Sequence, residues 1–205
     1  MHPNPIYRTA SEAEALAMAR ARGFGILSVN GSAGPLAAHI PFDLGQGEVF
    51  LHLARSNPIA RAALPAPALL AVSGPDAYVS PDWYGAVDQV PTWNYTAVHL
   101  RGVLEPLPQE ALRPHLQRMS AQMEARLAPK PIWTLDKMSD DAITRMFRMI
   151  VPFRLVIAGV ESTMKLNQNK TDTQRAGAAA GIAAAPIGLD ALRIAELMQG
   201  QVAPL

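Results

Sequence analysis

Strand-like segments crowd the first half of the chain before any long helix, and this run constrains the fold most strongly. The segments are apolar and partly β-branched, and they occupy residues 24–29, 36–42, 49–53, 68–72, 77–80 and 92–104. A parallel dinucleotide-binding sheet would alternate strands with helices and show a glycine-rich fingerprint after its first strand, and neither feature is present. Consecutive strands followed by helices instead predict a mainly β fold, a compact barrel with helical additions.

Local turn signals divide this run into hairpins. Asn30–Gly31 predicts a tight turn after the first strand, and Gly45–Gln46–Gly47 predicts another after the second. Gly74–Pro75–Asp76 predicts a break between two strands. A short helix is expected at residues 58–64, because Pro58 suits a first helical turn.

Capping residues locate the helices. Ser11 and Glu14 form a capping box that starts a helix over 12–22. An amphipathic helix is expected over 109–127, and Ser139 caps another that runs through Arg148. A last strand is predicted over 153–166 with a break at Gly159. The alanine-rich remainder predicts a helical hairpin, broken at 186–188.

Composition excludes several classes of protein. The 205 residues include no cysteine, so neither disulfides nor thiolate metal sites are possible. The net charge of +1, from 18 basic and 17 acidic residues, gives no overall footprint for nucleic acid. No apolar run approaches the length of a membrane span, and the N-terminus does not resemble a signal peptide. We therefore expect a cytoplasmic protein that does not enter membranes.

Two groups of candidate residues lie where predicted strands end. The first group is His39–Ile40–Pro41–Phe42, and the second is the turn from His52 to Pro58. Arg55, Ser56 and Asn57 in this turn offer a guanidinium fork and two neutral donors to an anion. The alternative is that the turn satisfies itself, with Arg55 solvated.

Two further groups carry aromatic and amide side chains. Trp83, Tyr84, Trp93 and Tyr95 lie within thirteen positions, as suits a planar ligand, a protein interface or simply a packed core. Strand alternation places Trp93 and Asn94 on opposite faces. The segment from Lys165 to Lys170 holds two cations and three amides for a phosphate or a polar ring edge, or forms a solvated turn before a helix.

Other catalytic chemistries lack their motifs. No two of the five histidines have the i, i+4 spacing of a helical zinc site. A Gly-x-Ser-x-Gly elbow and a Walker loop are also absent from the sequence. Metal-dependent and acyl-transfer reactions are therefore disfavoured.

Five segments in this order resemble the PaiB family, described as FMN-binding negative transcriptional regulators. They are HIPF at 39–42, HLARSNP at 52–58, AYVSPDWY at 77–84, VPTWNYTAVHLRG at 90–102 and KLNQNKTDTQRAG at 165–177. The resemblance implies an FMN-binding split β-barrel similar to the pyridoxamine phosphate oxidases, in which two FMN molecules lie between the subunits of a homodimer. Residues 1–166 would then form the flavin-binding barrel with inserted helices, and 167–205 a helical tail.

The resemblance also implies which residues contact the cofactor. The strand at 39–42 would lie along the isoalloxazine ring, the turn at 52–57 would hold the phosphate, and the two later segments would close the groove, in part from the partner subunit. The implied contacts are His39, Ile40, Pro41, Phe42, His52, Arg55, Ser56, Asn57, Trp93, Asn94, Lys165 and Gln168.

Three functions remain open. A PaiB-type regulator would use FMN as a sensor or structural ligand, although the sequence shows no basic recognition helix for DNA. A flavin-dependent oxidoreductase would act on a small molecule, with His39 and His99 as candidate acids or bases. A haem-binding split barrel would use His39, His52 or His99 as an axial ligand.

Overall fold

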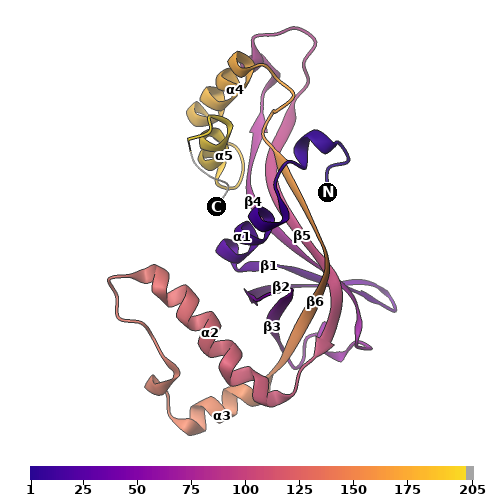
Figure 1. The fold of residues 1–205 in the computed structure, drawn as a ribbon, viewed down its shortest axis with the longest axis vertical. Coiled ribbons are helices and arrows are strands. Elements are labelled where there is room, and N and C mark those ends of the chain that lie inside the picture. The colour runs from indigo at the N-terminus through magenta and orange to yellow at the C-terminus, as the bar shows by residue number, and fades with distance from the viewer. Residues whose placement is uncertain (202–205) are drawn as a thin grey trace. The chain divides into compact units, whose positions relative to one another are not determined.

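A computed structural model describes residues 1–201 and folds six strands into a closed barrel (Figure 1). The strand order around the barrel is β1-β2-β3-β6-β5-β4. The pairs β1–β2, β1–β4, β2–β3 and β3–β6 are antiparallel. The strands are β1 (Phe24–Gly31), β2 (Gly34–Leu44), β3 (Glu48–Ala54), β4 (Ala66–Val79), β5 (Thr92–Pro106) and β6 (Ile150–Lys165).

The chain forms two compact units. The barrel unit comprises Gly23–Ala71 and Leu100–Gly159. The helical unit comprises Met1–Arg22, Val72–His99 and the described chain from Val160 onward. Strands β4, β5 and β6 each contribute a stretch to both units. The predicted domain boundary at residues 166 and 167 remains a prediction.

The β1–β2 hairpin of the barrel unit turns two residues later than the sequence predicted. The pairing runs from Phe24 opposite Pro41 to Gly31 opposite Gly34, so the turn residues are Ser32 and Ala33. A Cβ on Gly31 would lie 2.9 Å from the carbonyl oxygen of Gly34, and Gly34 has a φ of +128°. The glycine at position 31 therefore serves a close pairing of the strands and not the turn itself.

The long helices of the barrel unit come between β5 and β6 in the sequence. They are α2 (Leu112–Glu124) and α3 (Asp140–Met149), and Ser139 caps α3 by accepting a bond from the Ala142 N–H at 3.3 Å. Short 3-10 turns η4 (Gln109–Ala111) and η5 (Ala125–Leu127) complete the predicted helix over 109–127, while η6 (Leu135–Lys137) precedes α3. The helix predicted at 58–64 is wrong in length, because only η2 (Ile59–Arg61) forms there.

The predicted break at Gly74 is wrong, because β4 runs without interruption through this position. Gly74 is buried, and a Cβ there would lie 2.1 Å from Thr96 Oγ1 and 2.8 Å from Met18 Cε. The absence of a side chain lets two neighbours approach the strand closely. The break predicted at Gly159 is also wrong, since β6 is continuous.

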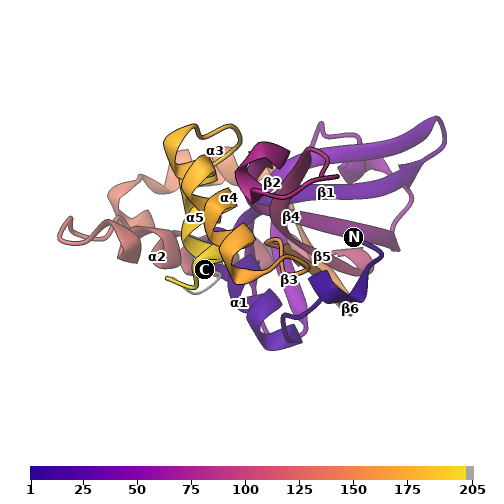
Figure 2. The same cartoon turned by 90° about the horizontal axis from the view of Figure 1, so that it is seen from above.

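Helices α1 (Glu12–Arg22), α4 (Asp172–Ala184) and α5 (Ala191–Met198) belong to the helical unit. The predicted capping box of α1 is confirmed, since Glu14 N–H donates to Ser11 Oγ at 3.3 Å and Ser11 N–H to Glu14 Oε2 at 2.7 Å. Helices α4 and α5 lie side by side as the predicted hairpin (Figures 1 and 2).

The hairpin of α4 and α5 covers part of β4. Ile182 and Ile194 are fully buried in a cluster that includes Ala77 and Val79 of the strand. The chain between the helices also pairs with the edge of β4, since Tyr78 N–H donates to the Ile187 carbonyl at 2.8 Å. The short turns η1 (Pro5–Tyr7) and η3 (Pro81–Tyr84) complete the helical unit. Within residues 1–201, every helix is too short or too polar to cross a bilayer.

Candidate functional site

The turn after β3 is built by its own backbone and by Asn57. Asn57 N–H donates to the Ala54 carbonyl at 2.8 Å, and Asn57 Oδ1 accepts from Ile59 N–H at 2.9 Å. The side chain of Asn57 thus fixes the start of η2. Ser56 is exposed, and its hydroxyl makes no hydrogen bond to any described residue. The alternative prediction holds for Asn57, which satisfies the turn, but not for Arg55, which bonds to the Arg148 carbonyl instead of being solvated alone. Ser56 remains available to a ligand.

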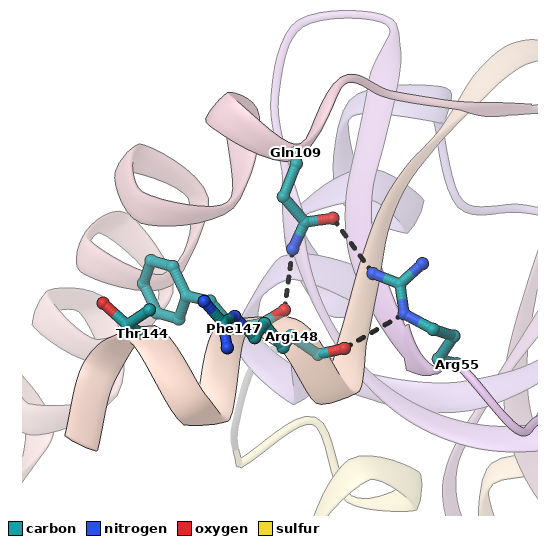
Figure 3. A pocket seen from close by; sticks show the side chains of 5 residues that line it. All are labelled: Arg55, Gln109, Thr144, Phe147 and Arg148. Carbon is teal, nitrogen blue, oxygen red and sulfur yellow. Dashed lines mark hydrogen bonds between the residues drawn. The ribbon is translucent and has the colours of Figure 1, made fainter. Parts of the chain in front are cut away.

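Arg55 reaches from this turn to the C-terminal end of α3 (Figure 3). Its Nε donates to the Arg148 carbonyl at 3.0 Å, and its Nη2 lies 3.4 Å from Gln109 Oε1 and 3.5 Å from the Ile150 carbonyl. Gln109 Nε2 donates to the Phe147 carbonyl at 2.7 Å, so the amide sits between Arg55 and the helix. Carbonyls at a helix C-terminus carry partial negative charge, which suits a guanidinium.

A pocket of about 460 Å³ opens beside Arg55. Its lining includes Arg55, Gln109, Thr144, Phe147 and Arg148, and it is the Arg148 carbonyl that faces Arg55. Arg55 Nη1 and the Arg148 guanidinium make no hydrogen bond to described residues. These free donors are suited to an anionic group.

His52 lies behind this turn and contacts a histidine that the sequence did not single out. Its Nδ1 is 3.2 Å from Nε2 of His115 on α2. Burial lowers the pKa of both imidazoles, and proximity to His52 lowers that of His115 further, to about 4. The contact spans 63 residues of sequence, so spacing alone could not have revealed it.

The strand residues predicted along the isoalloxazine ring point to two faces. Ile40 and Phe42 are buried in the core of the barrel unit, whereas His39 is exposed and Pro41 half-buried. The His39 ring lies 6.4 Å from that of Phe24, centroid to centroid. In the described chain, His39 and Pro41 are therefore the members of this group that a ligand can reach.

Trp93 and Asn94 lie on opposite faces of β5, as strand alternation predicted. Trp93 is 46% exposed and its ring meets Tyr78 edge to face, with centroids 6.1 Å apart. Asn94 is fully buried, and its Nδ2 contacts Met198 Sδ of α5 at 3.2 Å. Asn94 Oδ1 has no partner among the described residues.

Lys165 at the end of β6 and Gln168 in the turn that follows have different contacts. Gln168 stabilises the turn itself, since its Oε1 accepts from Leu166 N–H at 2.7 Å and its Nε2 donates to the Met164 carbonyl. Lys165 instead lines a pocket of the helical unit, together with Lys170. The predicted helix capped by Thr171 is confirmed, with Thr171 Oγ1 accepting from Gln174 N–H at 3.3 Å, but the turn before it is not solvated throughout, since Asn167 is buried.

The residues predicted to contact the cofactor thus fall into two groups. Those on β2 and in the turn after β3 belong to the barrel unit, and those on β5 and after β6 belong to the helical unit. Each group is ordered by contacts within its own unit. Their joint role in one cofactor site remains a prediction.

A closed six-stranded barrel with helices inserted between β5 and β6 is the mainly β, split-barrel class of fold that the sequence predicted. A family described as "Putative FMN-binding domain" matches residues 1–159. The chain belongs to this family, and FMN is the cofactor that the family assigns to it, as the sequence predicted.

One relative matches most of the chain. The chain is 30% identical over 155 residues to protease synthase and sporulation protein PAI 2 of Bacillus subtilis (strain 168), covering 73% of each chain. This similarity confirms the resemblance to PaiB.

Solved structures share the fold. The FAD and haem binding protein from Mycobacterium smegmatis superimposes with a TM-score of 0.57 at 18% identity, over 88% of this chain and 81% of that one. The flavocytochrome Anf3 from Azotobacter vinelandii gives a TM-score of 0.54 at 17% identity, over 76% of this chain and 67% of that one. At these identities the likeness establishes the split-barrel fold.

Proposed function

We propose that this chain is an FMN-binding regulator of the PaiB type that works as a homodimer. The single observation that carries the proposal is the turn after β3 in a chain of an FMN-binding family, where Arg55 lines a pocket and the neighbouring Ser56 hydroxyl has no hydrogen bond to described residues. Relatedness to PAI 2 supports the regulatory role. When bound, FMN supplies hydride or single-electron transfer.

The turn fits the phosphate of FMN in three respects. Arg55 is already oriented by Gln109 and by the α3 carbonyls, so little side-chain entropy remains to be lost on binding. Its Nη1 and the Ser56 hydroxyl stay free to donate. Asn57 holds the backbone of the turn, and its replacement would act through the loss of that support.

The first test is a titration of FMN, FAD and riboflavin followed by flavin fluorescence. We expect FMN to bind more tightly than riboflavin, because the turn holds the phosphate. Arg55→Ala and Ser56→Ala should each weaken the binding of FMN by about tenfold and leave the affinity for riboflavin unchanged. Arg145→Ala, on the same helix as Arg148 but outside the pocket, is the matched control. Equal affinities for FMN and riboflavin would contradict the proposal.

The homodimer is supported by the aromatic surface around Trp93. An exposed indole beside Tyr78 resembles the aromatic cores of protein interfaces. Light scattering should give twice the chain mass for the wild type and the monomer mass for Trp93→Arg. Ile132→Arg, at an equally exposed apolar residue of the barrel unit, should stay dimeric. A wild-type monomer would refute the homodimer.

Turnover separates the regulator from an oxidoreductase. With excess NADH or NADPH, a regulator should reduce no more than one equivalent of its own flavin. Sustained consumption of NADH or NADPH in the presence of oxygen or a nitro compound would favour the oxidoreductase instead. A Soret band in the purified protein would favour the haem-binding alternative. For the regulator, retention of promoter DNA in a gel should change on adding FMN and weaken with salt, because phosphate contacts release counterions.

A further inference from the structure

A second pocket lies wholly within the helical unit and is distinct from the pocket beside Arg55. Its volume is about 470 Å³. Three separate segments form its walls, the N-terminal residues 2–7, the segment 84–92 and the segment 165–170. Its polar lining residues include His2, Tyr7, Tyr84, Asp88, Gln89, Thr92, Lys165, Asn167 and Lys170.

Two ammonium groups line this pocket, and each has only neutral partners. Lys165 Nζ donates to Thr92 Oγ1 and lies 6.0 Å from the centroid of the Tyr7 ring. Lys170 Nζ donates to Gln89 Oε1 and lies 4.9 Å from the centroid of the Tyr84 ring. A hydroxyl, an amide and two aromatic faces orient these cations without neutralising them.

The charge of the pocket is not balanced by the chain. Neither lysine forms an ion pair with any described carboxylate. Asp88, an exposed residue, is the one acidic side chain among the lining residues. Lys165 is half-buried, and burial lowers its pKa, so its charged form is held at a cost that a bound anion would offset.

Buried contacts give the pocket a fixed wall. Asn167 is 2% exposed and adopts a left-handed backbone with a φ of 61°. Its Nδ2 donates to Tyr84 Oη at 3.0 Å, and its carbonyl accepts from Lys170 N–H at 3.0 Å. This link between the two segments sets the backbone from which Lys170 extends toward the pocket.

The N-terminal segment is held in place by contacts of its own. His2 N–H donates to the buried Thr163 Oγ1 at 3.1 Å, and the His2 ring meets that of Tyr7 edge to face at 4.6 Å. Tyr7 is itself only 6% exposed. The pocket is therefore built from ordered side chains on each of its three segments, and is not a gap beside mobile surface lysines.

We propose that this pocket binds a small carboxylate or phosphate anion, held jointly by Lys165 and Lys170, in addition to the flavin. The two ammonium groups supply the charge, and the Tyr84 hydroxyl and Asn167 amide lie beside it as further polar groups. This assigns Lys165 to the anion and not to the closing of the flavin groove. The ligand would be a substrate, an effector or inorganic phosphate.

The test is calorimetric titration of the full chain with inorganic phosphate and with succinate, before and after saturation with FMN. The wild type should bind at least one of the two anions saturably, with the same affinity in both states. Lys165→Met and Lys170→Met should each weaken that binding by about tenfold or more. Lys137→Met, a cation of the barrel unit, should change it less than about twofold.

Separate readouts distinguish this site from the flavin site. Circular dichroism confirms folding, and flavin fluorescence should give unchanged FMN affinity in Lys170→Met, a residue outside the implied cofactor contacts. The arginine variants Lys165→Arg and Lys170→Arg keep the charge and should retain part of the binding. No saturable binding of either anion by the wild type would overturn the proposal. So would full affinity in the methionine variants, or loss of anion binding on FMN saturation, which would place the anion in the flavin site.

Discussion

His52 Nδ1 lies 3.2 Å from His115 Nε2, and this contact joins β3 to α2 inside the barrel unit. His115 is only 2% exposed, and its Nδ1 has no hydrogen-bond partner among the described residues. One imidazole can donate to the other only while at least one of them is neutral. The contact therefore opposes protonation of both histidines together, and the burial of His115 opposes protonation of that ring.

We expect this pair to make the protein less stable in acid. Burial, together with His52, lowers the pKa of His115 from 6.5 to about 4. A histidine with a depressed folded-state pKa stabilises the fold above its unfolded value, and this contribution is lost as pH falls from about 6.5 toward 4. Asp43 and Arg118, which pair at 3.0 Å, are the nearby charged groups.

Urea unfolding at a series of pH values checks this expectation. The wild type should lose about 3 kcal/mol through His115 over this window. In His115→Leu the free energy of unfolding should fall less steeply with decreasing pH over this window. His39→Gln, at an exposed histidine, should keep the pH dependence of the wild type. An unchanged slope in His115→Leu would show that other groups cause the acid sensitivity.

Gly102 is expected to be intolerant of any side chain. An alanine Cβ there would lie 1.8 Å from the carbonyl oxygen of Val156, a backbone atom that cannot rotate away. Gly102→Ala should therefore cost about 3 kcal/mol or more, measured by urea unfolding. Gly159→Ala on β6, where no atom lies within 4 Å, is the control and should change stability by less than about 0.5 kcal/mol. Similar losses in both variants would contradict the steric account.

The sequence predicted the elements that depend on local chemistry. Apolar runs located the strands, and Ser11, Ser139 and Thr171 each accept the backbone bond of a helix cap. The prediction from sequence failed at Gly74, because Gly74–Pro75–Asp76 is typical of a turn. The glycine is instead required by the close approach of Thr96. Burial of a glycine against a distant segment leaves no local signal.

The candidate sites show the same division. The donors of Arg55 and Ser56 were predictable, because they lie together in one turn. The partners of Arg55 on α3 and the His115 partner of His52 lie 93 and 63 residues away, and only the fold brings them together. The pocket of Lys165 and Lys170 likewise depends on Tyr7, far away in the sequence.

Gln109 is expected to hold the C-terminal end of α3. Its amide donates to the Phe147 carbonyl at 2.7 Å and the Ile150 carbonyl at 3.2 Å, and accepts from Arg55. Gln109→Ala should cost about 1 kcal/mol locally, seen as hydrogen exchange in α3 that is about fivefold faster. Gln117→Ala, an exposed glutamine of α2, should leave α3 unchanged. Unaltered exchange in Gln109→Ala would mean that Arg55 alone secures the helix.

Thr171 is expected to set the stability of α4 through its hydroxyl. Its Oγ1 accepts from Gln174 N–H at 3.3 Å, while Gln174 Oε1 accepts from Thr171 N–H at 3.1 Å. Because α4 buries Ile182 in the core of the helical unit, fraying of its first turn should weaken that core. Thr171→Ala should cost about 1 kcal/mol in urea unfolding, and Thr171→Ser, which keeps the hydroxyl, only a few tenths. Equal losses in the two variants would assign the effect to the methyl group and refute the capping role.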